Sequence, residues 1–297
     1  MISTDMFSNI FWGYVMWKKV IVLSCLMAAF PLMARPSQEI TPLSEAAEQQ
    51  FTVMHHEMNN SGRAYRLYIA QPKQPQAAYT VVYMLDGNGQ FPMMLNQLSA
   101  GINRTLPLVV GIGYPSDIAY PKTRTLDYTP RAAGEQFADG GGETAFRQFI
   151  RQQVIPWVSN HYSVDNQRRY FFGHSLGGLF VLRTAMSEPD LFTDYISASP
   201  SLWWGHGTYI TPERIAAVSP DIRLTITQGG LEEKPDPSRM SDEQKQNLAA
   251  RYSEITAREV CEQLQQQGKQ CQLRSFTGKS HGSVIPDAIN TVILQLP

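Results

Sequence analysis

The residues best suited to chemistry form the segment Gly173-His-Ser-Leu-Gly177. It directly follows a short β-rich run at residues 169–172 and leads directly into residues 179–186 of a helical stretch at residues 176–187. A G-x-S-x-G segment between a strand and a helix holds its serine in a strained turn with the hydroxyl exposed, and small neighbours let the two elements pack closely. This context predicts that Ser175 is a nucleophile rather than an ordinary turn serine.

A serine hydroxyl needs a base in order to attack a carbonyl, and the chain has six histidines. His281 lies after the last predicted strand, at residues 271–276, and before a C-terminal helix. In α/β-hydrolases the order along the chain is nucleophile, acid, histidine, and His281 fits the last place. We therefore predict that His281 is the base, with a surface-loop histidine as the alternative. His174 is the variable position of the motif, so its ring is expected to point away from the Ser175 hydroxyl.

The acid is expected after a strand that lies between the nucleophile and the base. The predicted strand at residues 224–227 runs into Gln228-Gly-Gly-Leu-Glu-Glu233, which offers Glu232 as first candidate and Glu233 as second. Asp236 follows in the same loop and is a weaker third. The alternative is a Ser–His dyad with all three carboxylates solvated, because the acid chiefly orients the imidazole and stabilises its charged form.

Backbone amides are the candidates for an oxyanion hole. The N–H of Leu176 lies at the start of the helix, where it would face a developing negative charge. A second donor is expected from the glycine-rich segment Leu85-Asp-Gly-Asn-Gly-Gln90, through the N–H of Gly87 or Asn88. A tight turn with no catalytic role is the other interpretation of this segment.

Strands and helices that alternate along the chain must position these groups. Short, mostly apolar β-rich runs are typical of strands that are buried on both faces, and helical stretches lie between several of them. This alternation predicts an α/β fold of the α/β-hydrolase type, with a mostly parallel central sheet and helices on both faces, in one catalytic domain over residues 45–297. An antiparallel strand pair is expected at residues 51–56 and 65–70. The further predicted strands are residues 80–85, 106–112 and 195–198, and the further helices are residues 91–103, 143–162 and 242–267.

The N-terminal residues 1–34 resemble an export segment. Lys18 and Lys19 precede an uncharged, mostly apolar run at residues 20–34. This run is short for a membrane span, which needs about 20 apolar residues. Two interpretations stay open: a signal peptide that starts at Met16, or a longer segment from Met1 that stays uncleaved and tethers the protein to a membrane.

Disulfides persist outside the cytosol, so Cys261 and Cys271 are a natural pair in an exported protein, with two unpaired thiols as the alternative.

Composition excludes several classes of function. The chain has 297 residues, 43% of them hydrophobic, and a formal net charge of −1. A disordered chain would be less apolar, and a generic nucleic-acid binder would carry a basic excess, so no nucleic-acid partner is expected. The sequence has no H-E-x-x-H motif, no G-x-G-x-x-G after a strand and no Walker-type phosphate loop, so neither a metal nor another cofactor is expected.

Several motifs in one order resemble the putative-esterase branch of the α/β-hydrolases. Within that branch the sequence is most similar to the periplasmic esterases that cut the trilactone siderophores enterobactin and salmochelin. The motifs are Tyr83-Met-Leu-Asp-Gly-Asn88, Arg124-Thr-Leu-Asp-Tyr-Thr-Pro130, Gly142-Glu-Thr-Ala-Phe146, Phe172-Gly-His-Ser-Leu-Gly-Gly-Leu-Phe180 and Ser199-Pro-Ser-Leu-Trp-Trp204.

The resemblance implies ester hydrolysis in the periplasm, by an enzyme that is either free or anchored to the inner membrane. It implies a Ser–His dyad, with Ser175 and His281 in the two roles. Arg124 would contact the anionic catecholate, in ferric or apo form, and Trp203 and Trp204 would stack on catechol rings or else pack in the core or at the rim. A general carboxylesterase or acyltransferase, or a non-catalytic protein that binds a siderophore or envelope partner, is the alternative.

Overall fold

The computed structural model of the chain describes residues 37–101, 105–233, 238, 240–242, 245–246, 249 and 253–297. The predicted export segment at residues 1–34 and the third acid candidate, Asp236, lie outside the described residues. Among the helices of the described residues, none is both long enough and apolar enough to cross a bilayer.

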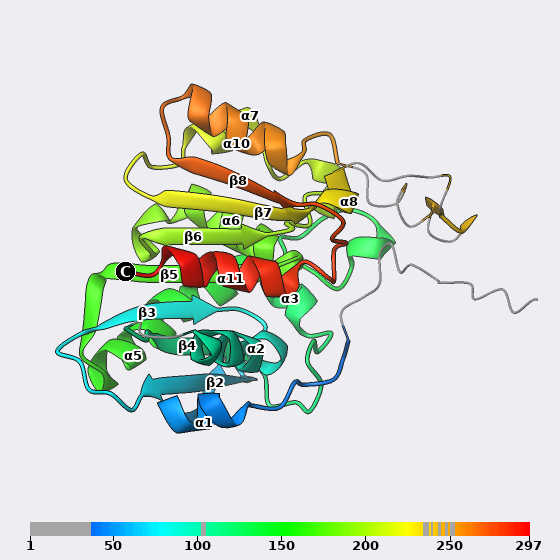
Figure 1. Cartoon of the computed structure of the whole chain (residues 1–297). Helices are drawn as coiled ribbons and strands as arrows, with labels where there is room; N and C mark the ends of the chain where they lie inside the picture. The colour runs from blue at the N-terminus through cyan, green and yellow to red at the C-terminus, as the bar shows by residue number, and fades with distance from the viewer. Residues whose placement is uncertain are drawn as a thin grey trace, which may run out of the picture. The chain divides into compact units, whose positions relative to one another are not determined.

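The described residues form an eight-stranded sheet (Figure 1). The first two strands pair antiparallel with each other, the second pairs antiparallel with the fourth, and all other neighbours are parallel. The order across the sheet is β1-β2-β4-β3-β5-β6-β7-β8, which is the mostly parallel arrangement that the sequence predicts. The strands are β1 (Phe51–Asn60), β2 (Arg63–Pro72), β3 (Tyr79–Met84), β4 (Leu108–Gly113), β5 (Val164–His174), β6 (Asp194–Ala198), β7 (Arg223–Gly229) and β8 (Cys271–Phe276).

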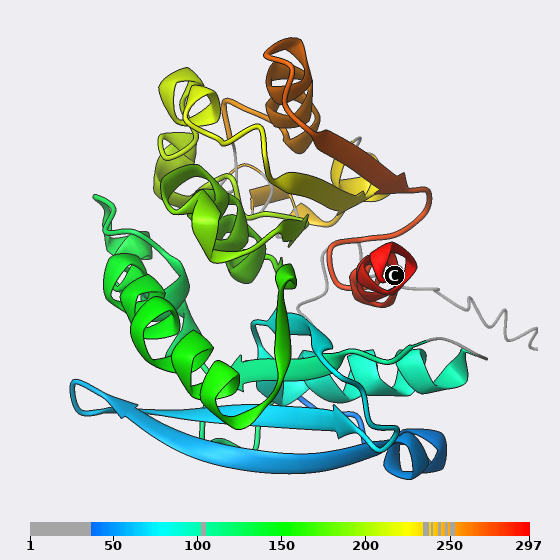
Figure 2. The ribbon, with the colours of Figure 1, turned by 90° about the vertical axis from the view of Figure 1, so that its left-hand side faces the viewer.

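Helices cover both faces of the sheet because its central strands are apolar on both sides. In β3, Val81 and Tyr83 join one buried cluster, whereas Val82 and Met84 join the other. The Val82 face is covered by α1 (Glu45–Gln50), α2 (Gly87–Ala100) and α11 (Ile285–Gln295), as Figures 1 and 2 show. Helices on the Tyr83 side include α3 (Arg124–Tyr128), α4 (Glu143–Phe149), a π-helical segment (Ile150–Val154), α5 (Ile155–His161), α6 (Leu176–Ser187), α7 (Pro212–Ala216) and α10 (Ala257–Gln266). The short elements are α8 (Gly230–Glu233) and the 3-10 helices Glu135–Phe137, Pro189–Leu191 and Trp204–Gly207.

Some element bounds differ from the sequence prediction for local reasons. Residues 242, 245, 246 and 249 are helical, as the sequence predicts, but residues 253–256 are not. A separate helix, α10, begins at Ala257 because Thr256 caps it: its hydroxyl accepts from the Glu259 N–H while the Glu259 carboxylate accepts from the Thr256 N–H. Helix α2 begins at Gly87, four residues before the predicted start, because Asp86 turns the chain in the left-handed region and its carbonyl accepts the first helical hydrogen bonds.

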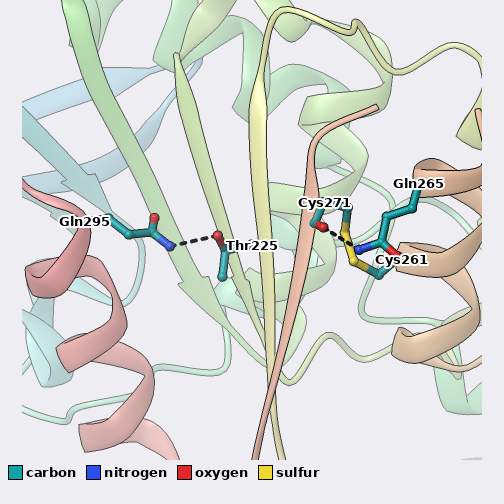
Figure 3. The surroundings of a disulfide bond; sticks show 5 residues. All are labelled: Thr225, Cys261, Gln265, Cys271 and Gln295. Carbon is teal, nitrogen blue, oxygen red and sulfur yellow. Dashed lines mark hydrogen bonds between the residues drawn. A yellow bond between two sulfur atoms is a disulfide. The ribbon is translucent and has the colours of Figure 1, made fainter. Parts of the chain in front are cut away.

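A disulfide joins Cys261 of α10 to Cys271, the first residue of β8 (Figure 3). The two Cα atoms are 5.5 Å apart, and the Gln265 side chain donates to the Cys271 carbonyl at 2.7 Å. The bond therefore ties a covering helix to the last strand of the sheet. On the other side of the neighbouring strand β7, Gln295 of α11 donates to the Thr225 hydroxyl at 2.8 Å.

Loss of this disulfide should lower the stability of the domain. A bridge that closes a loop of about ten residues restricts the unfolded chain and contributes roughly 2–3 kcal/mol. The double variant Cys261→Ala/Cys271→Ala should therefore lower the free energy of unfolding by that amount, measured by urea denaturation without reductant. The parent protein with reductant serves as control and should shift likewise. Equal stability of parent and double variant would show that the bridge contributes nothing.

Candidate active site

The predicted catalytic groups lie at the carboxyl edge of the parallel strands. Ser175 follows β5 directly, Glu232 lies in α8 directly after β7, and His281 follows β8. The carboxyl ends of parallel strands meet at one edge, which is where α/β sheets carry their sites. Three residues separated by up to 106 positions in sequence are thereby brought into hydrogen-bonding distance.

The backbone at Ser175 is strained, with φ 62° and ψ −119°. Such a conformation persists only where its surroundings determine it. Glycines allow it here, because a Cβ at Gly173 would lie 2.5 Å from the Gly177 carbonyl oxygen and one at Gly178 would overlap the Ala198 carbonyl oxygen. The Ser175 N–H donates to that same Ala198 carbonyl at 2.9 Å. The tight strand–turn–helix junction that the motif predicts is therefore present.

A chain of hydrogen bonds joins the serine, the histidine and the carboxylate. Nε2 of His281 is 2.9 Å from Oγ of Ser175, and Nδ1 is 2.6 Å from Oε2 of Glu232. The carboxylate can only accept, so Nδ1 carries the proton and Nε2 of the neutral ring accepts from the Ser175 hydroxyl. This is the arrangement in which a histidine can remove a proton from a serine while a carboxylate stabilises the charged ring.

The structure brings Glu232, not Glu233, to the histidine. Burial acts to raise the pKa of Glu232, but hydrogen bonds and charge from His281 and further hydrogen bonds from Ser199 and Gly229 lower it below its ordinary value. The Ser199 hydroxyl and the Gly229 N–H both donate to Oε1 at 2.7 Å, which leaves Oε2 for the ring. Glu233 instead forms an ion pair with Arg258 at 2.5 Å.

His174 contacts the backbone of the candidate base His281, a contact that sequence reasoning missed. Its ring is buried, and burial holds its pKa well below the ordinary value, so the ring is neutral. Nε2 lies 2.8 Å from the carbonyl oxygen of His281 and donates to it. The variable position of the motif therefore anchors the loop that carries the base. The motif itself gives no signal for this contact.

The predicted amide donors lie at the starts of two helices. Leu176 opens α6, and Gly87 and Asn88 open α2. Asn88 is fixed from both sides: its amide donates to the Tyr114 and Ser116 carbonyls at 2.9 Å, and its oxygen accepts from the Tyr114 N–H at 2.9 Å. The start of α2 is thus held rigidly, and the role of these N–H groups in an oxyanion hole stays a prediction.

Arg124 does not offer a free charge to a substrate. Its guanidinium binds the Asp86 carboxylate through two hydrogen bonds of 2.5 and 2.7 Å, and it lies over the rings of Tyr120 and Tyr128. The Arg124 side chain is 12% exposed and that of Asp86 is fully buried. The charge of Arg124 is neutralised inside the protein, and the substrate contact implied by the resemblance stays a prediction. The pair instead fixes the loop before α2.

The two tryptophans have different surroundings. Trp204 is 3% exposed, and its indole N–H donates to the Pro130 carbonyl at 2.9 Å. Its ring packs edge-on against Phe137. Core packing, the alternative interpretation for this residue, therefore describes Trp204 in the structure, and its stacking on a catechol stays a prediction. Trp203 is only partly buried and stays a candidate for contact with a ligand.

Within the described ranges, no group of three or more histidine, cysteine, aspartate or glutamate side chains is arranged to hold a metal ion. The site instead places the Ser175 hydroxyl beside the His281 ring and the ring beside the Glu232 carboxylate.

Comparison with known proteins identifies the family. Residues 58–283 match the sequence profile of a family described as "Putative esterase". The chain is 30% identical over 260 residues to the ferri-bacillibactin esterase BesA of Bacillus subtilis (strain 168), covering 79% of this chain and 85% of the relative. It is 32% identical over 216 residues to the apo-salmochelin esterase of Escherichia coli O6:H1, covering 67% of each.

A solved structure has the same architecture. The siderophore hydrolase EstA from Aspergillus nidulans superposes with a TM-score of 0.71 at 27% identity, over 86% of this chain and 96% of that protein. The sheet order, the family profile and the two relatives agree. The chain therefore belongs to the putative esterase family of α/β-hydrolases, and it is a carboxylic ester hydrolase.

Proposed function

We propose that this esterase hydrolyses the ester bonds of a catecholate trilactone siderophore of the enterobactin or salmochelin type, in ferric or apo form. The observation that carries the proposed chemistry is the hydrogen-bonded series Ser175–His281–Glu232. The substrate class is supported by the relatives, which are esterases of bacillibactin and salmochelin.

In the proposed mechanism, Ser175 Oγ attacks the ester carbonyl while its proton moves to Nε2 of His281. The N–H of Leu176, with that of Gly87 or Asn88, stabilises the oxyanion of the tetrahedral intermediate. His281 then gives the proton to the leaving alkoxide, and an acyl-enzyme remains on Ser175. Water, deprotonated by the same ring, hydrolyses the acyl-enzyme to the carboxylate and frees the serine.

We assign Glu232 to a triad rather than leaving Ser175 and His281 as a dyad. The contact between Nδ1 and Oε2 is 2.6 Å, and the lowered pKa of Glu232 keeps its carboxylate ionised at neutral pH. An ionised carboxylate beside Nδ1 stabilises the imidazolium that forms when the serine loses its proton.

The compartment is proposed on two features. The export-like residues 1–34 support delivery to the periplasm, either as a free enzyme or as one tethered to the inner membrane. The disulfide between Cys261 and Cys271 fits an oxidising space.

Substitution of the acidic and nucleophilic side chains tests the catalytic roles. Ser175→Ala should lower ester turnover by at least about a thousandfold and abolish labelling by a fluorophosphonate probe.

Glu232→Gln should lower turnover by about 10² to 10⁴-fold, because the neutral amide cannot stabilise the charged ring. Glu233→Gln is the matched control and should keep the parental rate, since Glu233 pairs with Arg258. A Glu232→Gln rate equal to that of Glu233→Gln would establish a dyad instead.

Analysis of the reaction products tests the substrate. The purified enzyme should convert ferric or apo enterobactin to linear trimer, dimer or monomer, each step adding one water, as followed by mass spectrometry. Ser175→Ala is the control and should leave the trilactone intact. An enzyme that cleaves simple acyl esters but leaves both forms of the trilactone unchanged is a general carboxylesterase, and the siderophore assignment then fails.

Removal of the Arg124 charge tests the role of this residue. Arg124→Met leaves the buried Asp86 charge without its partner, which costs about 3–5 kcal/mol in such pairs. Urea denaturation should show this loss, and the double variant Arg124→Met/Asp86→Asn should recover much of it. Parental stability of Arg124→Met, together with a raised KM for an anionic substrate, would instead favour direct contact with the substrate.

A further inference from the structure

Two serine hydroxyls on the loop after β6 contact the two ends of the catalytic hydrogen-bond series. Oγ of Ser201 lies 3.2 Å from Oγ of Ser175. Oγ of Ser199 donates to Oε1 of Glu232 at 2.7 Å. Both serines are buried, at 2% exposure. The segment Ser199-Pro200-Ser201 therefore contacts the nucleophile with one residue and the acid with the other.

The backbone of this segment is fixed to the elements on either side. The Ser201 N–H donates to the Ser175 carbonyl at 3.0 Å, and the Ser199 N–H donates to the Thr227 carbonyl of β7 at 2.7 Å. Pro200 packs against α6 so closely that a Cβ at Gly178 would lie 3.2 Å from its Cα. The two hydroxyls are thus held at defined places relative to the site.

Ser199 has a backbone conformation that non-glycine residues seldom adopt, with φ 41°. Backbone conformations of this kind are more frequent at functional sites, where the surrounding structure imposes them. Here it accompanies a side chain whose hydroxyl reaches the Glu232 carboxylate. Together with the Gly229 N–H, this hydroxyl saturates Oε1 and leaves Oε2 to face His281.

The hydrogen bond from Ser175 to His281 decides which of the two serines donates to the other. The Ser175 hydroxyl donates its proton to Nε2 of His281, so its oxygen accepts from the Ser201 hydroxyl. A donor on this oxygen stabilises the negative charge that develops as the proton leaves for the ring, and again when Oγ departs from the acyl-enzyme. Ser201 keeps its own proton throughout, so the balance of the reaction is unchanged.

We propose that Ser201 is a catalytic hydrogen-bond donor to the nucleophile and that Ser199 is a positioning residue for the acid. The inference rests on the proposed Ser175–His281–Glu232 chemistry. It does not depend on which ester is the natural substrate, so p-nitrophenyl acetate and a fluorophosphonate probe are sufficient to test it.

The test of Ser201 measures the rate of acylation in the first turnover. Ser201→Ala should acylate about tenfold more slowly, the size of one lost hydrogen bond to a developing charge. Ser201→Cys fills the space of the hydroxyl with a thiol that is only a weak donor, so this variant should also acylate slowly. Because it leaves no cavity, slow acylation by this variant cannot be attributed to a folding defect. Ser197→Ala is the control: its buried hydroxyl donates to the Gly178 carbonyl at 2.8 Å, and this variant should acylate at the parental rate. Acylation by Ser201→Ala and Ser201→Cys as fast as by Ser197→Ala overturns the role of Ser201.

The test of Ser199 measures the pH dependence of kcat/KM. The acid limb reports protonation of the His281–Glu232 pair as a unit. Without the Ser199 hydroxyl as donor, the Glu232 carboxylate would bind a proton more tightly and would stabilise the charged His281 ring more strongly. Ser199→Gly should therefore move the acid limb of kcat/KM to higher pH by about half a pH unit. Glycine tolerates positive φ, so this variant removes the hydroxyl without adding strain. Ser199→Ala should show the same shift of the acid limb but should be less stable than Ser199→Gly, because alanine tolerates positive φ less well than glycine.

The outcomes separate this inference from the proposed function. An acid limb that stays in place or moves to lower pH in both Ser199 variants contradicts the positioning role. If the parent labels with the probe, Ser175→Ala does not, and the variants of Ser199 and Ser201 match the parent, then only the present inference fails. Ester cleavage that survives in Ser175→Ala defeats the proposed function itself.

Discussion

The close approach of β5, α6 and the loop after β6 is the constraint on which the site depends. Side chains at Gly173 or Gly178 would enter space that the Gly177 and Ala198 carbonyls occupy. Because both positions lack a Cβ, the chain can turn through the strained conformation of Ser175 and place Leu176 directly at the start of a helix. The same approach brings the loop after β6 beside the nucleophile. The positions of Ser175, of the Leu176 N–H and of the loop after β6 thus follow from one packing requirement.

Fixed hydrogen bonds then connect the loops at the edge of the sheet. The loop after β8 is held by the His174 ring at its backbone and by Glu232 at its side chain. Glu232 is in turn fixed by the loop after β6 and by the last residue of β7. The loop after β3 is fixed by the buried pair of Asp86 and Arg124, whose guanidinium also reaches the His174 carbonyl at 3.4 Å. Each group is therefore oriented before a substrate arrives, which is the condition for electrostatic stabilisation of a transition state.

The sequence was sufficient for groups whose positions follow from topology and insufficient for groups whose positions follow from packing. The order of strands in a parallel sheet brings Ser175, Glu232 and His281 to one edge, so a motif and chain order suffice to nominate them. Arg124 and its partner lie 38 positions apart, and nothing in either motif shows that the pair is buried. Burial of Trp204, the contact of His174 with the His281 carbonyl and the strained φ of Ser199 likewise depend on tertiary packing that no local pattern encodes.

In the proposed mechanism, Ser175 is the covalent nucleophile towards a trilactone ester. Because the alcohol that leaves a lactone stays attached to the same molecule, acylation adds the whole mass of the trilactone to the enzyme. Rapid acid quenching during turnover, followed by peptide mass spectrometry, tests this directly. We expect a transient adduct of that mass on the peptide that contains Ser175, formed before linear trimer is released. Formation of linear trimer with an adduct on a different residue would contradict it.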